Sequence, residues 1–220
     1  MKILNNTYKA VIFDMDGVIS NTNPYHKKAW LKFAEKYNLE ITDYDLKNNM
    51  YGRTNNEIFK FLFKKGLLAG DIKVLSGEKE KIFREIYKDN AKPLKGLINF
   101  LNELKNSGIK IGLATSAPKD NVNFILNKLN IRSFFDLVID PSGVLKSKPD
   151  PEIYLKSAEL LKVKPQECIV FEDSIPGVEA GKAAGMKVIG VTSTHSKQEL
   201  NCKFTINDFD ELLINIQKVN

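Results

Sequence analysis

The most constraining feature of this 220-residue chain is the alternation of short apolar runs with helical patterns in its C-terminal half. Helical periodicity separates the later runs and predicts helices near 94–107, 120–129, 151–161, 176–184 and 208–217. Apolar runs typical of buried strands lie at 8–13, 109–114, 137–139, 168–171, 187–191 and 204–206. This order predicts an α/β fold, with a Rossmann-like parallel sheet that carries helices on both faces. Functional sites in such sheets lie at the carboxyl ends of the strands.

The interval between the first apolar run and the run at 109 departs from this order, because it contains no convincing strand. Trp30 and Phe33 belong to the apolar face of its first helical stretch, and we expect them in a local core. The helical stretches are 23–38, 54–66 and 77–89. We therefore expect a helical cap over 21–90, inserted into a core made of 1–20 and 91–220.

Composition excludes several classes of protein. With 43% hydrophobic and 27% charged residues, the chain can bury a sizeable core. No apolar run is long enough to span a bilayer, so we expect a cytoplasmic protein. The net charge of +6 is spread evenly and no nucleic-acid motif accompanies it, which favours solvated lysines over a nucleic-acid site. Cys168 and Cys202 lack metal-site spacing, and we expect Cys168 to be a buried thiol.

The first apolar run ends in two aspartates, within the stretch VIFDMDGVIS. In an extended chain Asp14 and Asp16 point the same way, so their charges repel unless a proton or a cation intervenes. Magnesium suits such carboxylates, and one of them could attack a phosphoryl group while the other donates a proton. Gly17 would allow a sharp turn. The alternative is an Asp-Gly turn with a solvated acid.

Three later strand ends carry compatible groups. Thr115 and Ser116 follow the second run, where hydroxyls and backbone N–H groups could hold a phosphoryl oxygen, although such residues often cap helices. Lys146 and Lys148 lie before a proline that opens a helix, and a lysine there could neutralise phosphate charge, whereas a solvent-facing lysine is commoner. Glu172 and Asp173 form a second acidic pair that could complete a magnesium site. Together the four strand ends predict phosphoryl-transfer chemistry.

In this order the motifs resemble those of the haloacid dehalogenase superfamily, especially its β-phosphoglucomutase-like branch. The segments that carry the resemblance are FDMDGVI, LATSA, KSKPDPEIY and VFEDSIPGVEAGKAAGM. The resemblance implies that Asp14 is the nucleophile and Asp16 the general acid and base. It also implies that Thr115 and Lys148 hold the transferring phosphoryl group.

The same resemblance implies a magnesium cofactor. Its ligands would be Asp14, the Asp16 backbone carbonyl and Asp173, with Glu172 either as a ligand or as a support for the ligands. The chain would then be a phosphoric monoester hydrolase acting on a small phosphorylated metabolite, and we expect a monomer. Carbon–halogen cleavage is disfavoured, because dehalogenases of this fold lack an acid at the position of Asp16.

The resemblance leaves phosphatase and mutase open. In β-phosphoglucomutases a cap histidine and lysine help to distinguish sugar from water, and His26 and Lys79 match these positions. Arg53 lies near the arginine that binds a distal phosphate there, but the longer surrounding pattern is missing. His26 could instead be a packing histidine, and a non-catalytic phosphate-binding protein is the third hypothesis. His195 is expected to be an exposed loop residue without a role.

Overall fold

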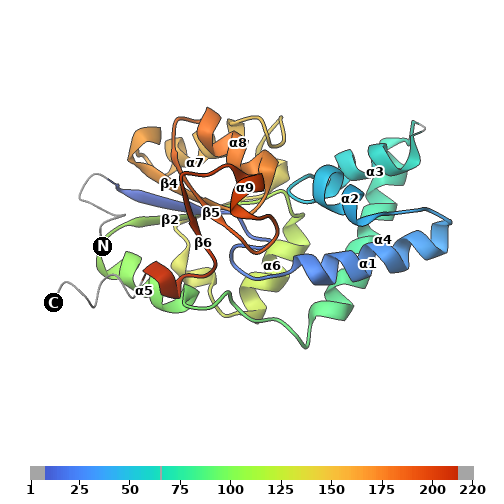
Figure 1. Ribbon diagram of the computed structural model, residues 1–220, viewed down its shortest axis with the longest axis horizontal. Helices are drawn as coiled ribbons and strands as arrows, with labels where there is room; N and C mark the ends of the chain where they lie inside the picture. Colours follow the sequence, from blue (N-terminus) through green and yellow to red (C-terminus); the bar gives the residue numbers. More distant parts are fainter. Residues whose placement is uncertain (1–7, 65, 213–220) are drawn as a thin grey trace.

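The core of the protein is a six-stranded parallel sheet (Figure 1). The computed structural model describes residues 8–64 and 66–212. Strand order is β3-β2-β1-β4-β5-β6, so β1 lies between β2 and β4 near the middle of the sheet. The strands are β1 (Ala10–Phe13), β2 (Lys110–Ala114), β3 (Leu137–Ile139), β4 (Cys168–Glu172), β5 (Lys187–Val191) and β6 (Phe204–Ile206). The predicted α/β class and parallel sheet are confirmed.

Helices cover both faces of the sheet (Figure 1). Apolar side chains of α5 (Leu97–Asn106) and α6 (Lys119–Lys128) pack on one face, and those of α7 (Glu152–Leu160) and α8 (Ile175–Ala183) pack on the other. Shorter helices complete the core: η2 (Arg132–Phe134), η3 (Pro141–Gly143), η4 (Pro165–Glu167) and α9 (Lys197–Leu200). The helix expected at 208–217 lies largely outside the described residues.

Phe13, the last residue of β1, is fully buried at the centre of the larger core cluster. Its ring stacks on Phe171 with centroids 5.3 Å apart and meets Phe100 edge-on at 6.2 Å. Such pairs add to the free energy of burial. The aromatic cluster therefore fixes the end of β1, from which the paired aspartates emerge.

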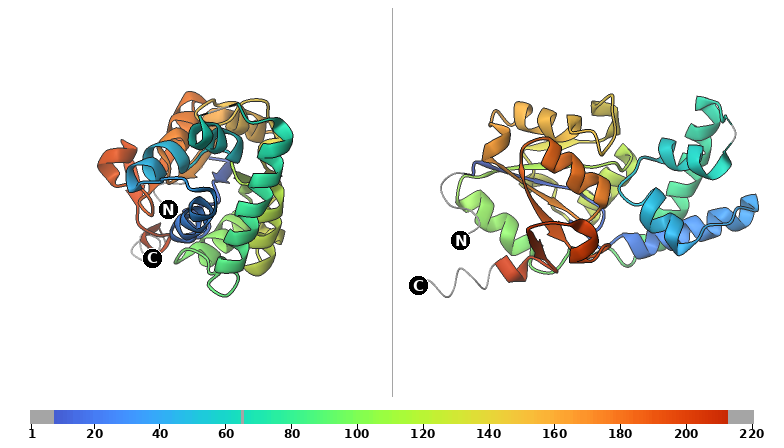
Figure 2. Two further views of the ribbon diagram at one scale, coloured as in Figure 1. Left: turned by 90° about the vertical axis from the view of Figure 1, so that its right-hand side faces the viewer. Right: turned by 45° about the horizontal axis from the view of Figure 1, so that its top comes forward.

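A helical insertion follows β1 and extends beyond one end of the sheet (Figure 2). Its own core contains the buried Trp30, Phe33 and Phe59, as expected for the first two. Its elements are α1 (Asn23–Tyr37), α2 (Asp43–Asp45), the π-helix η1 (Leu46–Met50), α3 (Asn55–Phe63) and α4 (Ala69–Tyr87). The predicted helical insertion is confirmed.

Two details of the insertion differ from the sequence-based expectation. Helix α4 begins at Ala69 and not near residue 77, because Ile72 and Leu75 pack on the cap core. The segment 43–50, for which no helix was predicted, forms α2 and η1.

The two chain segments that join insertion and core lie side by side. The backbone N–H of Leu94 donates to the carbonyl of Ile19 over 2.8 Å, and the Ser20 hydroxyl donates to the carbonyl of Lys92 over 2.5 Å. Ser20 also hydrogen-bonds to the Tyr87 hydroxyl at the end of α4. Domain boundaries at 20/21 and 90/91 stay a prediction that is compatible with these contacts.

Other expectations from composition agree with the structure. Cys168 and Cys202 are free and buried, and burial raises the pKa of the Cys168 thiol to about 12. Among the described residues, no helix combines the length and the apolar character that crossing a bilayer requires.

We predict that Phe13→Ala lowers the free energy of unfolding by about 3–5 kcal/mol, because it leaves a cavity within the aromatic cluster. Urea unfolding followed by circular dichroism measures the change. Leu145→Ala is the control, since that side chain is 98% exposed, and a shift within about 0.5 kcal/mol is expected. Equal effects of the two substitutions would contradict the central role of Phe13.

Candidate active site

Strand register brings the predicted groups to one edge of the sheet. Phe13 pairs with Leu113 of β2 on one side and with Phe171 of β4 on the other. Asp14 and Glu172, each one residue further along its strand, therefore lie next to each other. Thr115 follows the end of β2, where its backbone N–H donates to the carbonyl of Ile139. The sheet thus gathers residues from distant parts of the chain.

Three buried carboxylates form an acidic cluster, defined as Asp14, Glu172 and Asp173. One oxygen from each lies within 4.8 Å of the others. Burial raises the pKa of Asp14 to about 8, with a further contribution from Glu172 and against the effect of Lys148. Burial also raises the pKa of Asp173 well above its ordinary value, helped by Asp14 and Glu172. The cluster carries more negative charge than its surroundings balance.

Lys148 lies within this cluster and is almost fully buried. Its Nζ donates to Asp14 Oδ1 and to Glu172 Oε1, both over 2.6 Å. Burial alone would lower the pKa of Lys148, but the two carboxylates raise it, so the ammonium stays charged. Lys146, the other lysine of this segment, is exposed and lies 3.4 Å from Asp150.

Glu172 is saturated with hydrogen-bond donors. Its Oε1 accepts from Lys148 and from the Tyr154 hydroxyl over 2.6 Å. Its Oε2 accepts from the Ser174 hydroxyl over 3.0 Å and from the backbone N–H of Asp173 over 3.1 Å. Helix α8 comes close only because residue 177 is glycine: a Cβ there would lie 1.9 Å from Glu172 Oε1. The carboxylate is therefore rigidly held.

These residues fit a divalent cation. Asp14, Glu172 and Asp173 offer hard oxygen donors at one place, and a single lysine cannot neutralise three buried carboxylates. Burial and the neighbouring acids together raise the pKa values of Asp14 and Asp173, and a cation would stabilise the charged forms of both. Asp16 contributes no carboxylate to the acidic cluster.

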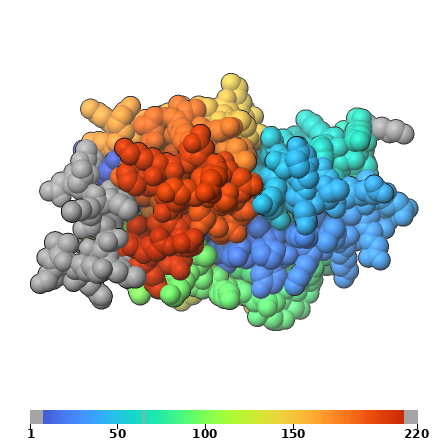
Figure 3. All heavy atoms as spheres, viewed as in Figure 1, coloured from blue at the N-terminus to red at the C-terminus, as the bar shows by residue number. Residues whose placement is uncertain are grey.

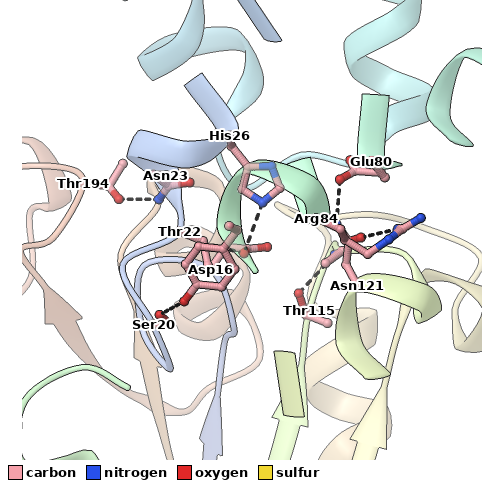
Figure 4. Close-up of polar contacts among 12 residues, drawn as sticks. Asp16, Ser20, Thr22, Asn23, His26, Glu80, Arg84, Thr115, Asn121 and Thr194 are labelled. Atoms are coloured by element: carbon pink, nitrogen blue, oxygen red, sulfur yellow. Dashed lines mark hydrogen bonds and ion pairs between the residues drawn. The ribbon is translucent and has the colours of Figure 1, made fainter. Parts of the chain in front are cut away.

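The Asp16 carboxylate is held instead by residues that follow it (Figure 4). Thr22 Oγ1 donates to Asp16 Oδ1 over 2.6 Å, and His26 Nε2 lies 3.3 Å from the same oxygen. The Lys79 ammonium lies 2.8 Å from His26 Nδ1. Since an ammonium only donates, Nδ1 accepts and the ring hydrogen lies on Nε2, facing Asp16. Burial would raise the pKa of Asp16, but His26 and Thr22 hold it below its ordinary value.

Gly17 permits the turn between β1 and the insertion. Its φ is +78°, in the left-handed region that favours glycine. A Cβ at this position would lie 1.9 Å from Asp173 Oδ2. The turn expected at Gly17 is therefore present, and both aspartates line the cavity at the sheet edge.

A small cavity of about 60 Å³ lies between the sheet edge and the insertion. Asp14, Asp16 and Thr115 line it from the core, and His26, Arg53 and Lys79 line it from the insertion. It has room for only a few water-sized molecules, so the insertion lies close to the sheet edge. Figure 3 shows no open cleft between the two parts on the face that it presents.

Two predicted substrate-binding residues have other partners within this cavity. Ser116 Oγ donates to the carbonyl of Gly52 over 2.9 Å, which joins core and insertion. Arg53 Nη1 lies 3.7 Å from Glu57 Oε1, and the Arg53 side chain is about one-third exposed. Arg53 is therefore available to a ligand in the cavity.

His195 lies in a loop, as expected, but the expectation that it is exposed is wrong. The side chain is 2% exposed and lies between core and insertion. Its Nδ1 lies 2.9 Å from the backbone oxygen of Asp173, and its Nε2 lies 3.2 Å from that of Lys47 in η1. Sequence reasoning failed because the burial comes from a long-range contact with the insertion, which no local pattern reports.

Sequence reasoning also missed four residues that border the site. Asn23 Nδ2 donates to Asp173 Oδ2 over 3.0 Å, and Thr194 hydrogen-bonds to the same oxygen. Glu80 and Asn121 are buried and hydrogen-bonded to each other across the cavity (Figure 4). The i, i+4 spacing of Glu80 and Arg84 was the one sequence pattern that could have pointed to this contact, but such pairs usually lie on solvent-exposed helix faces.

A model of the haloacid dehalogenase-like hydrolase family matches residues 11–191. The chain belongs to this family. A phosphorylated carbohydrates phosphatase from Thermotoga maritima is 38% identical over 185 residues, 82% of this chain and 83% of the relative. A β-phosphoglucomutase from Bacillus subtilis is 36% identical over 192 residues and covers 83% of both chains.

The structure of this hydrolase agrees with that grouping. The crystal structure of a β-phosphoglucomutase from Clostridium difficile superimposes with a TM-score of 0.84 at 30% identity, over 96% of each chain. The hydrolase therefore belongs to the β-phosphoglucomutase-like branch, and the resemblance in its motifs is confirmed. The roles of individual site residues stay predictions.

For the metal-free hydrolase, we predict that Asp14→Asn raises Tm at pH 8 by at least about 2–4 °C. The folded protein binds a proton on Asp14 between the ordinary pKa of 3.8 and about 8, so its stability falls as pH rises through this window. Asparagine does not ionise, so the Asp14→Asn variant does not lose stability in this way as pH rises. Calorimetry at pH 5 and pH 8 in chelator should show the difference growing with pH, and a constant difference would contradict the burial of this charge.

Proposed function

We propose that the protein is a magnesium-dependent phosphatase that hydrolyses a small phosphate ester through an aspartyl-phosphate. The observation that carries the proposal is the position of Asp14. Its carboxylate is held 2.6 Å from a buried ammonium, beside two further acids, and it lines a small cavity. A binding protein would have no need for such a carboxylate.

In the first step, an Asp14 carboxylate oxygen forms a bond to phosphorus as the bond from phosphorus to the ester oxygen breaks. Asp16 gives its proton to the leaving oxygen, so that an alcohol departs. In the second step, a water oxygen attacks phosphorus, Asp16 takes the proton of that water, and the bond to Asp14 breaks. Inorganic phosphate leaves and both aspartates are restored. The His26 hydrogen near Asp16 Oδ1 favours the ionised form that the second step needs.

The transferring group is a dianion that requires positive and polar partners. Lys148 supplies positive charge, and Thr115 and Ser116 supply hydroxyl or backbone N–H groups. Asp14, Asp173 and the Asp16 backbone carbonyl would hold magnesium, which neutralises charge on the phosphoryl group when bound. Glu172, saturated by other donors, would support Lys148 and would not serve as the main metal ligand.

The substrate class we propose is a sugar or polyol phosphate. Polar groups such as Lys79, Glu80 and Asn121 line the cavity and suit a hydroxylated leaving group. Arg53 could hold a further anionic group on the substrate. The relative named for phosphorylated carbohydrates supports the same class. A cytoplasmic monomer that needs no nucleic acid or membrane partner is part of this proposal.

The alternative is a β-phosphoglucomutase that passes the phosphoryl group to a second sugar hydroxyl. One arrangement favours it: Lys79 and His26 form a buried pair directed at Asp16, where they could position a sugar hydroxyl in place of water. Relatives carrying the mutase name support it as well.

Phosphate release from a panel of sugar and polyol phosphates with Mg²⁺ tests the proposal. The same preparation is assayed for conversion of β-glucose 1-phosphate to glucose 6-phosphate with glucose 1,6-bisphosphate as primer. We expect hydrolysis without isomerisation, lost with chelator and at least about 10³-fold slower in Asp14→Asn. The Lys146→Met variant is the matched control for Lys148→Met, because only Lys148 lies in the acidic cluster.

Two results would contradict the proposal. Activity that persists in Asp14→Asn would mean that the nucleophile is misassigned. Rapid isomerisation with little phosphate release would establish the mutase in place of the phosphatase.

A further inference from the structure

Glu80, on helix α4 next to Lys79, joins the insertion to the core. Its side chain is 5% exposed, and that of Asn121 on core helix α6 is completely buried. Asn121 Nδ2 donates to Glu80 Oε2 over 2.6 Å. Both residues line the cavity that Asp14 and Asp16 line. Their contact therefore crosses between the two parts of the protein at the site itself.

The side-chain oxygen of Asn121 also binds a residue of helix α4. Arg84 Nη1 donates to Asn121 Oδ1 over 2.7 Å, and Arg84 lies four residues after Glu80 on one face of α4 (Figure 4). A single core side chain is thus bound at both polar ends by one turn of the insertion. We call these three residues, Glu80, Arg84 and Asn121, the clasp.

The second carboxylate oxygen of Glu80 contacts residues that connect it to Asp16. Glu80 Oε1 accepts from Lys79 Nζ over 2.8 Å and from Asn55 Nδ2 over 2.9 Å. Burial would raise the pKa of Glu80, but Lys79 and His26 lower it to about 2, so the carboxylate is charged. Lys79 in turn contacts His26, which contacts Asp16. A continuous series of polar contacts therefore runs from the clasp to Asp16.

We propose that Glu80 and Asn121 are positioning residues: their contact holds the insertion closed and keeps Lys79 and His26 directed at Asp16. Neither needs to touch a reacting atom for this role. The catalytic consequence rests on the proposed function, in which Asp16 is the acid and base. When the insertion opens, water replaces Asn121 at Glu80, and His26 moves away from Asp16.

The variants Glu80→Gln and Asn121→Ala test the inference from opposite sides of the contact. Glu78→Gln is the matched control, because Glu78 is on the same helix but binds Lys36 and Tyr37 outside the cavity. Trp30 is the only tryptophan in the chain, lines the cavity and is 2% exposed. Quenching of its fluorescence by acrylamide therefore reports opening without any substrate.

In Mg²⁺, we expect both clasp variants to shift the ratio of open to closed forms by about 5- to 150-fold, and to raise quenching accordingly. With p-nitrophenyl phosphate and with a sugar phosphate, kcat should fall by about 10²-fold, while KM changes less. Glu78→Gln should match the wild type in both measurements. The double variant should be no worse than the more damaging single variant, because both act through one contact.

Quenching equal to the wild type in both clasp variants would overturn the inference, and so would increased quenching with unchanged kcat. Glu80→Gln preserves side-chain size, so it serves if Asn121→Ala fails to fold. If the wild type hydrolyses no phosphate ester, the proposed function fails, and the quenching comparison then decides the inference alone.

Discussion

The two ion pairs of Lys148 with Asp14 and Glu172 are the interactions on which the rest of the site depends. The parallel register of β1 and β4 forces these two acids together, and Asp173 follows directly. One ammonium leaves this group with excess negative charge. Such a site is costly unless a cation and an anionic substrate share the charges. The fold therefore concentrates negative charge at a place where phosphoryl-transfer chemistry uses a cation.

The insertion supplies what the sheet edge lacks. The core holds the proposed nucleophile and the charge-balancing lysine, while the insertion brings His26 and Lys79 to Asp16. The resulting cavity is small and lies between the two parts. Hydrogen bonds from Ser116 to Gly52 and from His195 to Lys47 join the two parts directly.

Whether a feature of the site could be predicted depends on how far apart in the sequence the residues that define it lie. Asp14 and Asp173 could be found because strand ends and their polar residues are adjacent in the chain, and the parallel sheet brings such ends together. Lys148 lies nine residues after the end of β3, and it was distinguished from Lys146 by the resemblance to the family motif. The burial of His195 and the contact between Glu80 and Asn121 could not be found, since each joins segments far apart in sequence.

Secondary structure shows the same division between local and tertiary causes. All six strands were predicted, because their apolar runs are continuous. Helix α4 was predicted too short, since packing of Leu75 on the cap core outweighs the low helix propensity of Gly77. The backbone oxygen of Lys47 in the π-helix η1 contacts His195 Nε2 in the core, and the local sequence of η1 does not predict this contact.

The most direct test of the account is to locate the phosphoryl group during turnover. Wild-type protein is mixed with a phosphate ester that it hydrolyses, in Mg²⁺, quenched in acid within one turnover, digested and analysed by mass spectrometry. The account predicts a phosphorylated peptide modified at Asp14 that disappears as inorganic phosphate accumulates. Phosphate release with modification at another residue, or with none at Asp14 at any time during the turnover, would contradict it.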